Sequence, residues 1–486
     1  MKRNLLIFPV FLLFAGCVVQ NDQGFAETNA TDAVETVAAA QPVHLEDALM
    51  EMYSLMDDVG PGTRSSKTIK SVELIGGQTL RHATRSGESI VDSLLYLVNF
   101  DEGGFSVLAA DARLQSVLAL SFQGELSSEA FTGGASTTPT YSLSDLWVEE
   151  DGDYLLGDVN GGVFIADMLI SYAMKVIYDF NPNPPTGIDP GIDDIGGGST
   201  NPGTNVTYTY LYGDWQVDEG NTRRRILNNN IRWDQGKPFN EYCPVIDRDT
   251  MVAGCTAIAV MQIVAHHQFP DARGLWHGNY STSYGDVTLR FTLNLSWPAL
   301  TDSTYTTFNT SLRHSAGWIA RWIGHKCNMK YDFFGTGGSF ATPAKAADFL
   351  EELGYDATRY VGYTGEKLRR SIMEGYPGIV GGISNEKEET RSDKKSKGGH
   401  AWVADGWMTR YADYIRRGSD GSQTVVGRKT QSLVHCNWGW SGSCDGYYVS
   451  DVFNLIAGPT VVGEGDDQDD RPRNYDFSMR TVIIKR

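Results

Sequence analysis

The segment that most restricts the fold of this chain is MVAGCTAIAVMQIVAHHQFP, residues 251–270. Its apolar residues have helical spacing and predict a helix that begins at about Cys255 and ends before Pro270. Because those residues lie on most sides of such a helix, the helix must be buried on most of its surface. A chain that contains it needs other elements to cover it from several directions.

The bulk composition sets wider limits. The chain has 486 residues, of which 41% are hydrophobic and 21% charged, and this globular composition and length predict two or three domains. A formal net charge of −19 argues against a nucleic-acid partner, because phosphates repel an acidic protein. Six cysteines are too few for a disulfide-built scaffold, so ordinary hydrophobic cores must hold the fold.

The first seventeen residues predict export. A basic start is followed by LLIFPVFLLFAG, which is too short for a permanent membrane-spanning helix, and then by Cys17. This pattern is typical of a bacterial lipoprotein signal peptide in which Cys17 is lipidated, and a plain signal peptide cut elsewhere is the alternative. No later stretch is apolar enough to span a membrane. We expect a cell-envelope protein that its N-terminal lipid anchors at the periplasmic face or the outer surface, or that is released after processing.

Changes in composition divide the rest of the chain. Residues 18–45 are polar and alanine-rich, as in a flexible tether. Residues 46–180 predict a helix at each end and, between them, an antiparallel hairpin that turns at Gly103–Gly104 and leads into a third strand. Residues 181–206 are rich in Pro, Gly and Asn and predict an exposed connector that is open to proteolysis. Residues 207–486 form the second folded region.

Three roles are open to Cys255 from its own surroundings: a buried small side chain, a metal ligand or an activated nucleophile. A thiol at a helix N-terminus faces unpaired amide donors and the positive end of the helix dipole, which lowers its pKa toward the thiolate. Free cysteine is also commonly buried as an inert side chain. His266 and His267 point in different directions on a helix and lack an HExxH or paired CxxC pattern, so we expect no metal site.

Three further segments favour the nucleophile. KGGHAWVADGW places His400 at the start of an alternating strand, 145 residues after Cys255, and papain-like enzymes separate these residues by roughly 130–150. SLVHCNWGWSGSCDGYY ends a second strand at Asn437, whose side chain can accept the imidazole N–H while Trp438 shields that bond from water. IRWDQGKPFNEYCP supplies Gln235, whose amide would complete an oxyanion hole with the amide of Cys255.

Together these motifs resemble the streptopain family of papain-like cysteine peptidases. The similarity runs over roughly residues 205–486, and GGFSVLAADARLQSVLALS resembles the prosegment of the same family. The resemblance implies a zymogen in which residues 46–180 act as an intramolecular inhibitor and are removed by proteolysis. It also implies an α+β catalytic domain of two lobes, with a helical lobe led by the Cys255 helix and an antiparallel sheet that carries His400 and Asn437.

The resemblance assigns roles to particular residues. It makes Cys255 the nucleophile, His400 the general acid and base, Gln235 the oxyanion donor, and Asn437 and Trp438 the residues that orient and shield the imidazole. It places a substrate wall at Gly337, Gly338, Ser339 and Gly399. The chain departs from the family pattern in its lipoprotein signal and tether, in four extra cysteines, and in the charged insertion NEKEETRSDKKSK before His400. Subsite preference therefore does not carry over.

The sequence thus predicts a monomeric cysteine endopeptidase that cleaves proteins or peptides and needs no cofactor or metal. Two other classes stay open. One is a catalytically inactive lipoprotein that binds proteins, and the intact Cys, His, Gln and Trp set argues against it. The other is a papain-like amidase or transglutaminase, against which the covering prosegment argues. No GxSxG or P-loop pattern supports a serine hydrolase or a nucleotide-binding protein.

Overall fold

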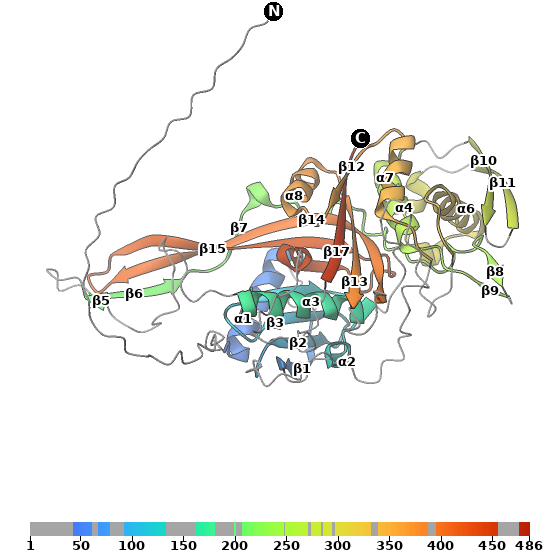
Figure 1. Ribbon diagram of the computed structural model, residues 1–486. Coiled ribbons are helices and arrows are strands. Elements are labelled where there is room, and N and C mark those ends of the chain that lie inside the picture. The colour runs from blue at the N-terminus through green and yellow to red at the C-terminus, as the bar shows by residue number, and fades with distance from the viewer. Residues whose placement is uncertain are drawn as a thin grey trace, which may run out of the picture. The chain divides into compact units, whose positions relative to one another are not determined.

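The computed structural model of the chain describes residues 42–60, 67–77, 92–132, 161–179, 199–200, 207–246, 248–270, 274–282, 285–293, 297–331, 339–386, 395–454 and 476–486 (Figure 1). The signal peptide with Cys17, most of the tether and most of the connector lie outside the described residues. So do Gly337, Gly338 and most of the charged insertion.

The N-terminal region (residues 46–180) has the predicted helix–sheet–helix arrangement. Its elements are α1 (Leu45–Val59), β1 (Ile69–Ile75), β2 (Leu95–Phe100), β3 (Phe105–Ala109), β4 (Val117–Ser121), α2 (Ser128–Thr132) and α3 (Gly161–Asp179). The terminal helices and the hairpin with its third strand are confirmed, and Gly103 and Gly104 make the turn with φ of 78° and 100°. Strands β3 and β4 are buried at every residue rather than alternating, because α1 packs on them and further apolar side chains cover the rest.

The C-terminal region (residues 207–486) has more helix near its start and more strand near its end. Its helices are η4 (Glu219–Asn221), α4 (Cys255–His267), α5 (Trp297–Thr301), η5 (Tyr305–Thr307), α6 (Thr310–Lys326), α7 (Pro343–Glu352), α8 (Gly365–Glu374) and η6 (Ser450–Phe453). Its main strands are β6 (Thr207–Tyr212), β12 (Asp356–Val361), β13 (Gly378–Glu386), β14 (Lys395–Gly418), β15 (Gln423–Asn437), β16 (Gly446–Val449) and β17 (Asp476–Lys485). Short pairs are β5 (Ser199–Thr200) with β6, β7 (Gln216–Val217) with β14, β8 (Val245–Ile246) with β9 (Asp249–Thr250), and β10 (Gly274–Thr282) with β11 (Gly285–Leu293). The α+β class is confirmed.

Helix α4 is the centre of the helical lobe, as its composition requires. Every residue from Cys255 to Ala265 is buried. The helix packs on α5, α6 and α7 and, across the lobe boundary, on β13 and β14. Its surroundings include Ala401 and Val403 of β14, which belong to the same hydrophobic core. The nucleophile candidate and the strand of His400 are therefore held in one packed unit.

One antiparallel sheet runs through both regions of the chain. Its strand order is β1-β2-β3-β4-β16-β15-β14-β13-β17-β12, so the N-terminal region adds its strands to the C-terminal sheet at the β4–β16 pair. The change in composition at residues 181–206 predicts two separate domains. Hydrogen bonds between residues more than 300 positions apart join them instead, which local sequence patterns do not reveal.

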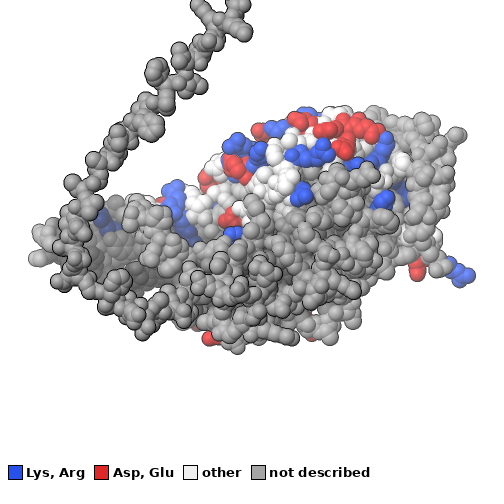
Figure 2. Space-filling view, in the orientation of Figure 1, with Lys and Arg blue, Asp and Glu red and all other residues white. Residues whose placement is uncertain are grey.

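Strands β14, β15 and β6 form an arm that extends well beyond the rest of the molecule (Figure 1). Aromatic and basic side chains stack along it, with the guanidinium of Arg428 3.9 Å from the Tyr411 ring centre and that of Arg416 4.8 Å from the Tyr208 ring centre. These contacts stiffen a hairpin that has few core residues of its own. On the coloured surface of Figure 2, basic and acidic side chains are interspersed.

The cysteines and the described helices add two observations. None of the five described cysteines is in a disulfide, so Cys436 and Cys444 do not pair. All five are buried: Cys243, Cys255, Cys327, Cys436 and Cys444. Burial raises the pKa of the Cys243 thiol to about 12, as suits an inert side chain. Among the described residues, no helix combines the length and apolar character needed to cross a membrane.

Candidate active site

Cys255 is the first residue of α4, as the sequence predicts. The residue before it, Gly254, has φ of 90°, and a Cβ there would lie 2.6 Å from Met329 Sδ and 3.0 Å from the Ser339 carbonyl oxygen. Only glycine fits this bend, which turns the chain sharply into the helix. The thiol therefore lies at the positive end of the α4 dipole, beside the unpaired amides of its first turn.

Gln235 lies beside the start of α4. Its backbone carbonyl accepts a hydrogen bond from the Ala253 amide at 2.9 Å, which fixes Gln235 close to Cys255. The side chain is 1% exposed, and neither its oxygen nor its nitrogen has a hydrogen-bond partner among the described residues. A buried amide without a partner costs free energy, and such a group is retained where it has a function. The Gln235 side-chain amide can therefore donate a hydrogen bond to an oxyanion that forms during a reaction.

The loop that holds Gln235 is tied to the tryptophan turn after β15. Asp234 accepts hydrogen bonds from the Gly236 amide at 2.8 Å, from the Tyr305 hydroxyl at 3.1 Å and from the Ser441 hydroxyl at 2.5 Å. The Ser441 amide donates to the Trp233 carbonyl at 3.2 Å. These bonds fix the oxyanion candidate relative to the turn that carries Trp438.

His400 is fully buried near the start of β14, with aromatic rings around it. Its Nε2 lies 2.6 Å from the Trp438 carbonyl oxygen. The Trp440 ring centre is 4.4 Å away, and Trp402 and Trp438 lie at 6.3 Å and 6.1 Å. Burial lowers the pKa of His400 to about 4, because a low-dielectric site disfavours the imidazolium. The imidazole is neutral at neutral pH.

Helix α3 contributes a side chain to this site. The Phe164 ring meets His400, Trp402 and Trp438 edge-on, with centroid distances of 6.1, 6.0 and 6.3 Å. It also lies over Gly382, the residue that pairs with His400 across β13 and β14. A phenylalanine of the N-terminal region is therefore part of the wall around the imidazole.

Asn437 does not take the position that the sequence predicts. Its Oδ1 accepts hydrogen bonds from Gln262 Nε2 at 3.0 Å and from the Gly439 amide at 3.2 Å, and its Nδ2 donates to the Ile231 carbonyl at 2.7 Å. The oxygen that His400 Nε2 contacts is the Trp438 carbonyl instead. In this state, with Phe164 beside the imidazole, Asn437 links α4 to the tryptophan turn.

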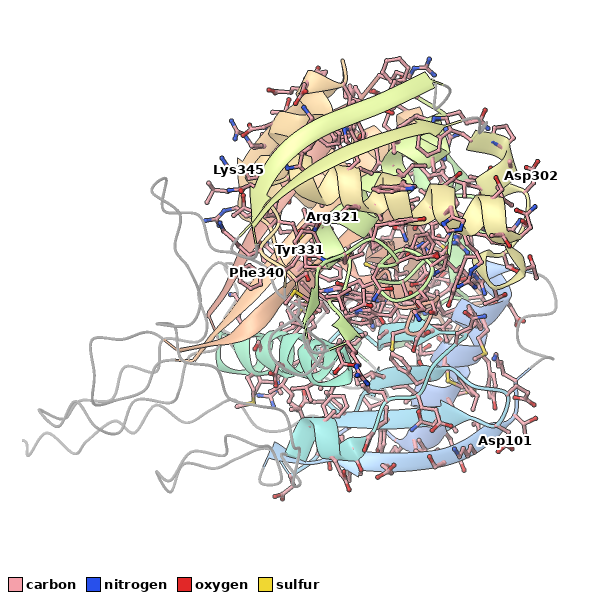
Figure 3. All side chains as sticks on the ribbon, turned by 90° about the vertical axis from the view of Figure 1, so that its right-hand side faces the viewer. Asp101, Asp302, Arg321, Tyr331, Phe340 and Lys345 are labelled. Atoms are coloured by element: carbon pink, nitrogen blue, oxygen red, sulfur yellow. The ribbon has the colours of Figure 1, made fainter. Side chains whose placement is uncertain are left out.

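Two of the predicted substrate-wall residues are described. Ser339 is buried and donates to the Val252 carbonyl at 2.6 Å, while Gly399 is buried in β14 and pairs with Ile383. Figure 3 shows Arg321, Tyr331 and Phe340 close together in the helical lobe, with the Arg321 guanidinium 4.2 Å from the Tyr331 ring centre. Phe340 and Lys330 bond to each other through their backbones, which joins the segment after Ser339 to the residues that follow α6. Ser339 thus lies beside Gly254, the residue before Cys255, since a Cβ on Gly254 would be 3.0 Å from its carbonyl oxygen.

The site contains residues that the sequence reasoning missed. Trp402 lies two positions after His400 on the same strand face, so strand alternation was a signal for it. Asp445, whose carboxylate accepts the Trp438 amide at 2.9 Å, lies in the quoted DGYY segment but had no identifiable partner. No sequence pattern indicated that Phe164 belongs to the site, because only the tertiary fold brings α3 to β14.

The arrangement has the parts for acyl transfer and is closed. A thiol at a helix start, a buried amide donor and a buried imidazole lie on segments that pack against or bond to one another, but Cys255 is 2% exposed and His400 is 0% exposed. A polypeptide substrate needs access to both residues. Within the part of the chain that the structure describes, no group of His, Cys, Asp and Glu side chains could hold a metal ion.

Comparisons with known proteins match the part of the chain that contains these site residues. The model of the peptidase C10 family matches residues 233–448, which include Gln235, Cys255, His400, Asn437 and Trp438. Streptopain of Streptococcus pyogenes serotype M1 is 21% identical over 496 residues, which cover 96% of this chain and 95% of that protein. The thiol protease/hemagglutinin PrtT of Porphyromonas gingivalis is 23% identical over 254 residues, 48% of this chain and 24% of that protein.

Solved structures of Prevotella intermedia interpain A are also similar. The alignment with a prointerpain A fragment covers 86% of this chain and 98% of the fragment, with a TM-score of 0.46 and 17% sequence identity. The active interpain A protease covers 54% of this chain, with a TM-score of 0.36 and 21% identity. Residues 233–448 are therefore similar to the peptidase C10 family, and nearly the whole chain is similar to streptopain.

Proposed function

We propose that this protein is a cysteine endopeptidase made as a zymogen, with Cys255 as nucleophile and His400 as general acid and base. Residues 46–180 are its inhibitory prosegment, and activation cuts the connector at 181–206. The lipid on Cys17 anchors the precursor in the cell envelope. The anchor is supported by the signal-peptide pattern and the small residues before Cys17.

The proposed reaction uses each of the grouped residues. His400 takes the proton of the Cys255 thiol, and the resulting thiolate attacks the carbonyl carbon of a peptide bond. The oxyanion that forms accepts hydrogen bonds from Gln235 and the Cys255 amide. His400 gives a proton to the departing amine as the C–N bond breaks. Water, deprotonated by His400, then attacks the thioester and releases the acid and the free thiol. Neither a cofactor nor a metal takes part.

The observation that carries the proposal is the position of Phe164. It belongs to α3 of the proposed prosegment, yet it packs against His400 and two of the tryptophans that surround the imidazole. A region that only tethered the enzyme would have no reason to place an aromatic ring there. The contact supports latency in two ways, since it blocks access to His400 and removes water that would stabilise the imidazolium.

A test uses Cys255→Ala in the full-length chain. We expect a folded precursor that is never processed and does not cleave casein, whereas the wild-type protein matures. A thiol-directed epoxide should label Cys255 of the wild-type protein only after the prosegment has left. Cys243→Ala is the matched control, because Cys243 is also a buried cysteine that is in no disulfide, and it should mature normally. Self-processing and casein cleavage by Cys255→Ala would show that the nucleophile is assigned wrongly.

A further inference from the structure

Strand β4 joins the sheet of the C-terminal region at its β16 edge, while β3 pairs with the other side of β4. It pairs antiparallel with β16 through Ser121↔Gly446, Leu120↔Tyr447 and Ala119↔Tyr448. At the last residue of β4, the Ser121 hydroxyl donates to the Asp445 carbonyl at 2.9 Å. Beyond the strand, the Cys444 amide donates to the Gln123 carbonyl at 3.0 Å. Most of these bonds use only backbone groups on β4, so they set few limits on its side chains.

Gly446 makes this approach possible. A Cβ at Gly446 would collide with the Leu120 carbonyl oxygen and lie 2.8 Å from Ser121 Cα. The φ of Gly446 is not in the left-handed region, so backbone conformation does not require glycine there. The close approach of another strand does require it.

Basic side chains lie beside the N-terminal end of β4. Arg410 is completely buried, and its guanidinium lies 3.6 Å from Glu51 and 3.5 Å from Asp58, both on α1. Its Nε donates to Gln431 at 2.7 Å, and Gln431 donates to the Val117 carbonyl at 3.0 Å. The cationic site and the strand site are therefore adjacent, and both are filled by the prosegment.

Further contacts in the same place fit an acidic ligand. The Ser116 hydroxyl, just before β4, donates to Glu51 at 3.3 Å, so a carboxylate occupies the space next to the start of the strand.

Two cations lie close to the Trp215 ring. Lys429 lies 5.7 Å from the Trp215 ring centre, and the Arg410 guanidinium lies 4.3 Å from the same ring centre. Arg224 donates to the carbonyl of Asp58 at 3.0 Å. Two cations held over one indole are a strong site for a carboxylate once they lose Glu51 and Asp58.

We propose that in the mature enzyme the β16 edge and these cations form an exosite for protein substrates. The exosite binds an extended apolar segment by strand addition and selects acidic residues directly N-terminal to it. The inference rests on the proposed function, because the edge is exposed only after the prosegment has been removed. It concerns a surface outside the cleft and leaves the chemistry at Cys255 unchanged.

The test measures binding to mature enzyme whose cleft is blocked by a thiol-directed epoxide. The probe is a fluorescein-labelled peptide of residues 116–124 preceded by three glutamates, EEESVLALSFQG, and binding is followed by fluorescence anisotropy. We expect saturable binding that becomes at least about tenfold weaker when lysines replace the glutamates, since charge reversal turns attraction into repulsion. A proline in place of Leu120 should abolish binding, because it removes a backbone donor. Absence of binding, or equal binding of all three peptides, would overturn the exosite.

A second measurement separates the exosite from catalysis. With unblocked enzyme, the glutamate peptide should slow casein cleavage several-fold and leave hydrolysis of a short fluorogenic peptide unchanged. Equal inhibition of both reactions would place the peptide in the cleft and contradict the proposal. If neither substrate were cleaved, the proposed function would fail, while the anisotropy result would still decide whether the β16 edge binds the peptide.

Discussion

At the scale of single residues, the proposed latency depends on what surrounds His400. The imidazole is inside a cage of Trp402, Trp438, Trp440 and Phe164, and only Phe164 comes from the prosegment. The three tryptophans stay when the prosegment leaves. Phe164 is thus the side chain whose departure opens the cage, and it can be tested separately from the rest of the prosegment.

Phe164→Ala should weaken closure of the site. Loss of a buried phenylalanine side chain costs about 3–5 kcal/mol, so the open state should become at least about 100-fold more populated. We expect faster labelling of Cys255 by iodoacetamide in the uncut chain and faster self-processing. Phe131→Ala is the control, because Phe131 is equally buried in the prosegment core but is not among the rings around His400. Equal acceleration by both variants would show that Phe164 acts only through prosegment stability.

At the scale of elements, α4 acts as a rigid support for Cys255, the proposed nucleophile. Most helices at a protein surface bury one stripe, and α8 does so with Leu368, Ser371 and Ile372. Helix α4 is buried on every side for eleven consecutive residues. The position of Cys255 is therefore fixed by packing from both lobes, and changes on any face of α4 should be felt.

An alanine scan of the two helices tests this difference. In the Cys255→Ala chain, Ile258→Ala, Met261→Ala and Ile263→Ala should each lower the free energy of unfolding by about 2–5 kcal/mol, although they lie on different faces of α4. In α8, Leu368→Ala should have a similar cost. Lys367→Ala should cost only about 0.5–1 kcal/mol, because exposed Lys367 loses no more than its contact with the Tyr360 ring at 3.9 Å. Urea unfolding gives these values. A periodic pattern in α4, with some positions neutral, would contradict burial on all sides.

At the scale of the whole molecule, the sequence revealed local structure well and long-range pairing poorly. Helical spacing predicted α1, α3 and α4, and the motifs predicted the strands that carry His400 and Asn437. The β4–β16 pair, the contact of Phe164 with His400 and the Arg410 ion pairs join residues more than 200 positions apart. Such contacts depend on topology, which periodicity does not encode. The oxyanion role of Gln235 and the substrate wall stay predictions.

Burial of His400 in the closed molecule makes the binding of the proposed prosegment depend on pH. His400 has a pKa of about 4 in the closed molecule, below the ordinary value of 6.5, so the open state binds more protons. Above pH 6.5 His400 is neutral in both states and does not weaken prosegment binding. As the pH falls from 6.5 toward 4, protonation of His400 in the open state weakens prosegment binding by about 1.4 kcal/mol per pH unit. Two carboxyl groups oppose this, because burial raises the pKa of Asp58 and raises that of Asp445 to about 6.

A pair of variants separates the histidine from these carboxyl groups. Both carry Cys255→Ala, one also carries His400→Gln, and the connector is cut so that the prosegment can dissociate. For the chain with His400, the Kd of the prosegment should rise more steeply from pH 6.5 to pH 4.5 than for His400→Gln, with a difference approaching tenfold per pH unit. The carboxyl groups cancel in this comparison, because both chains contain them. Identical slopes would mean that His400 is already solvated in the closed molecule, and the cage of rings would then not exclude water from the imidazole.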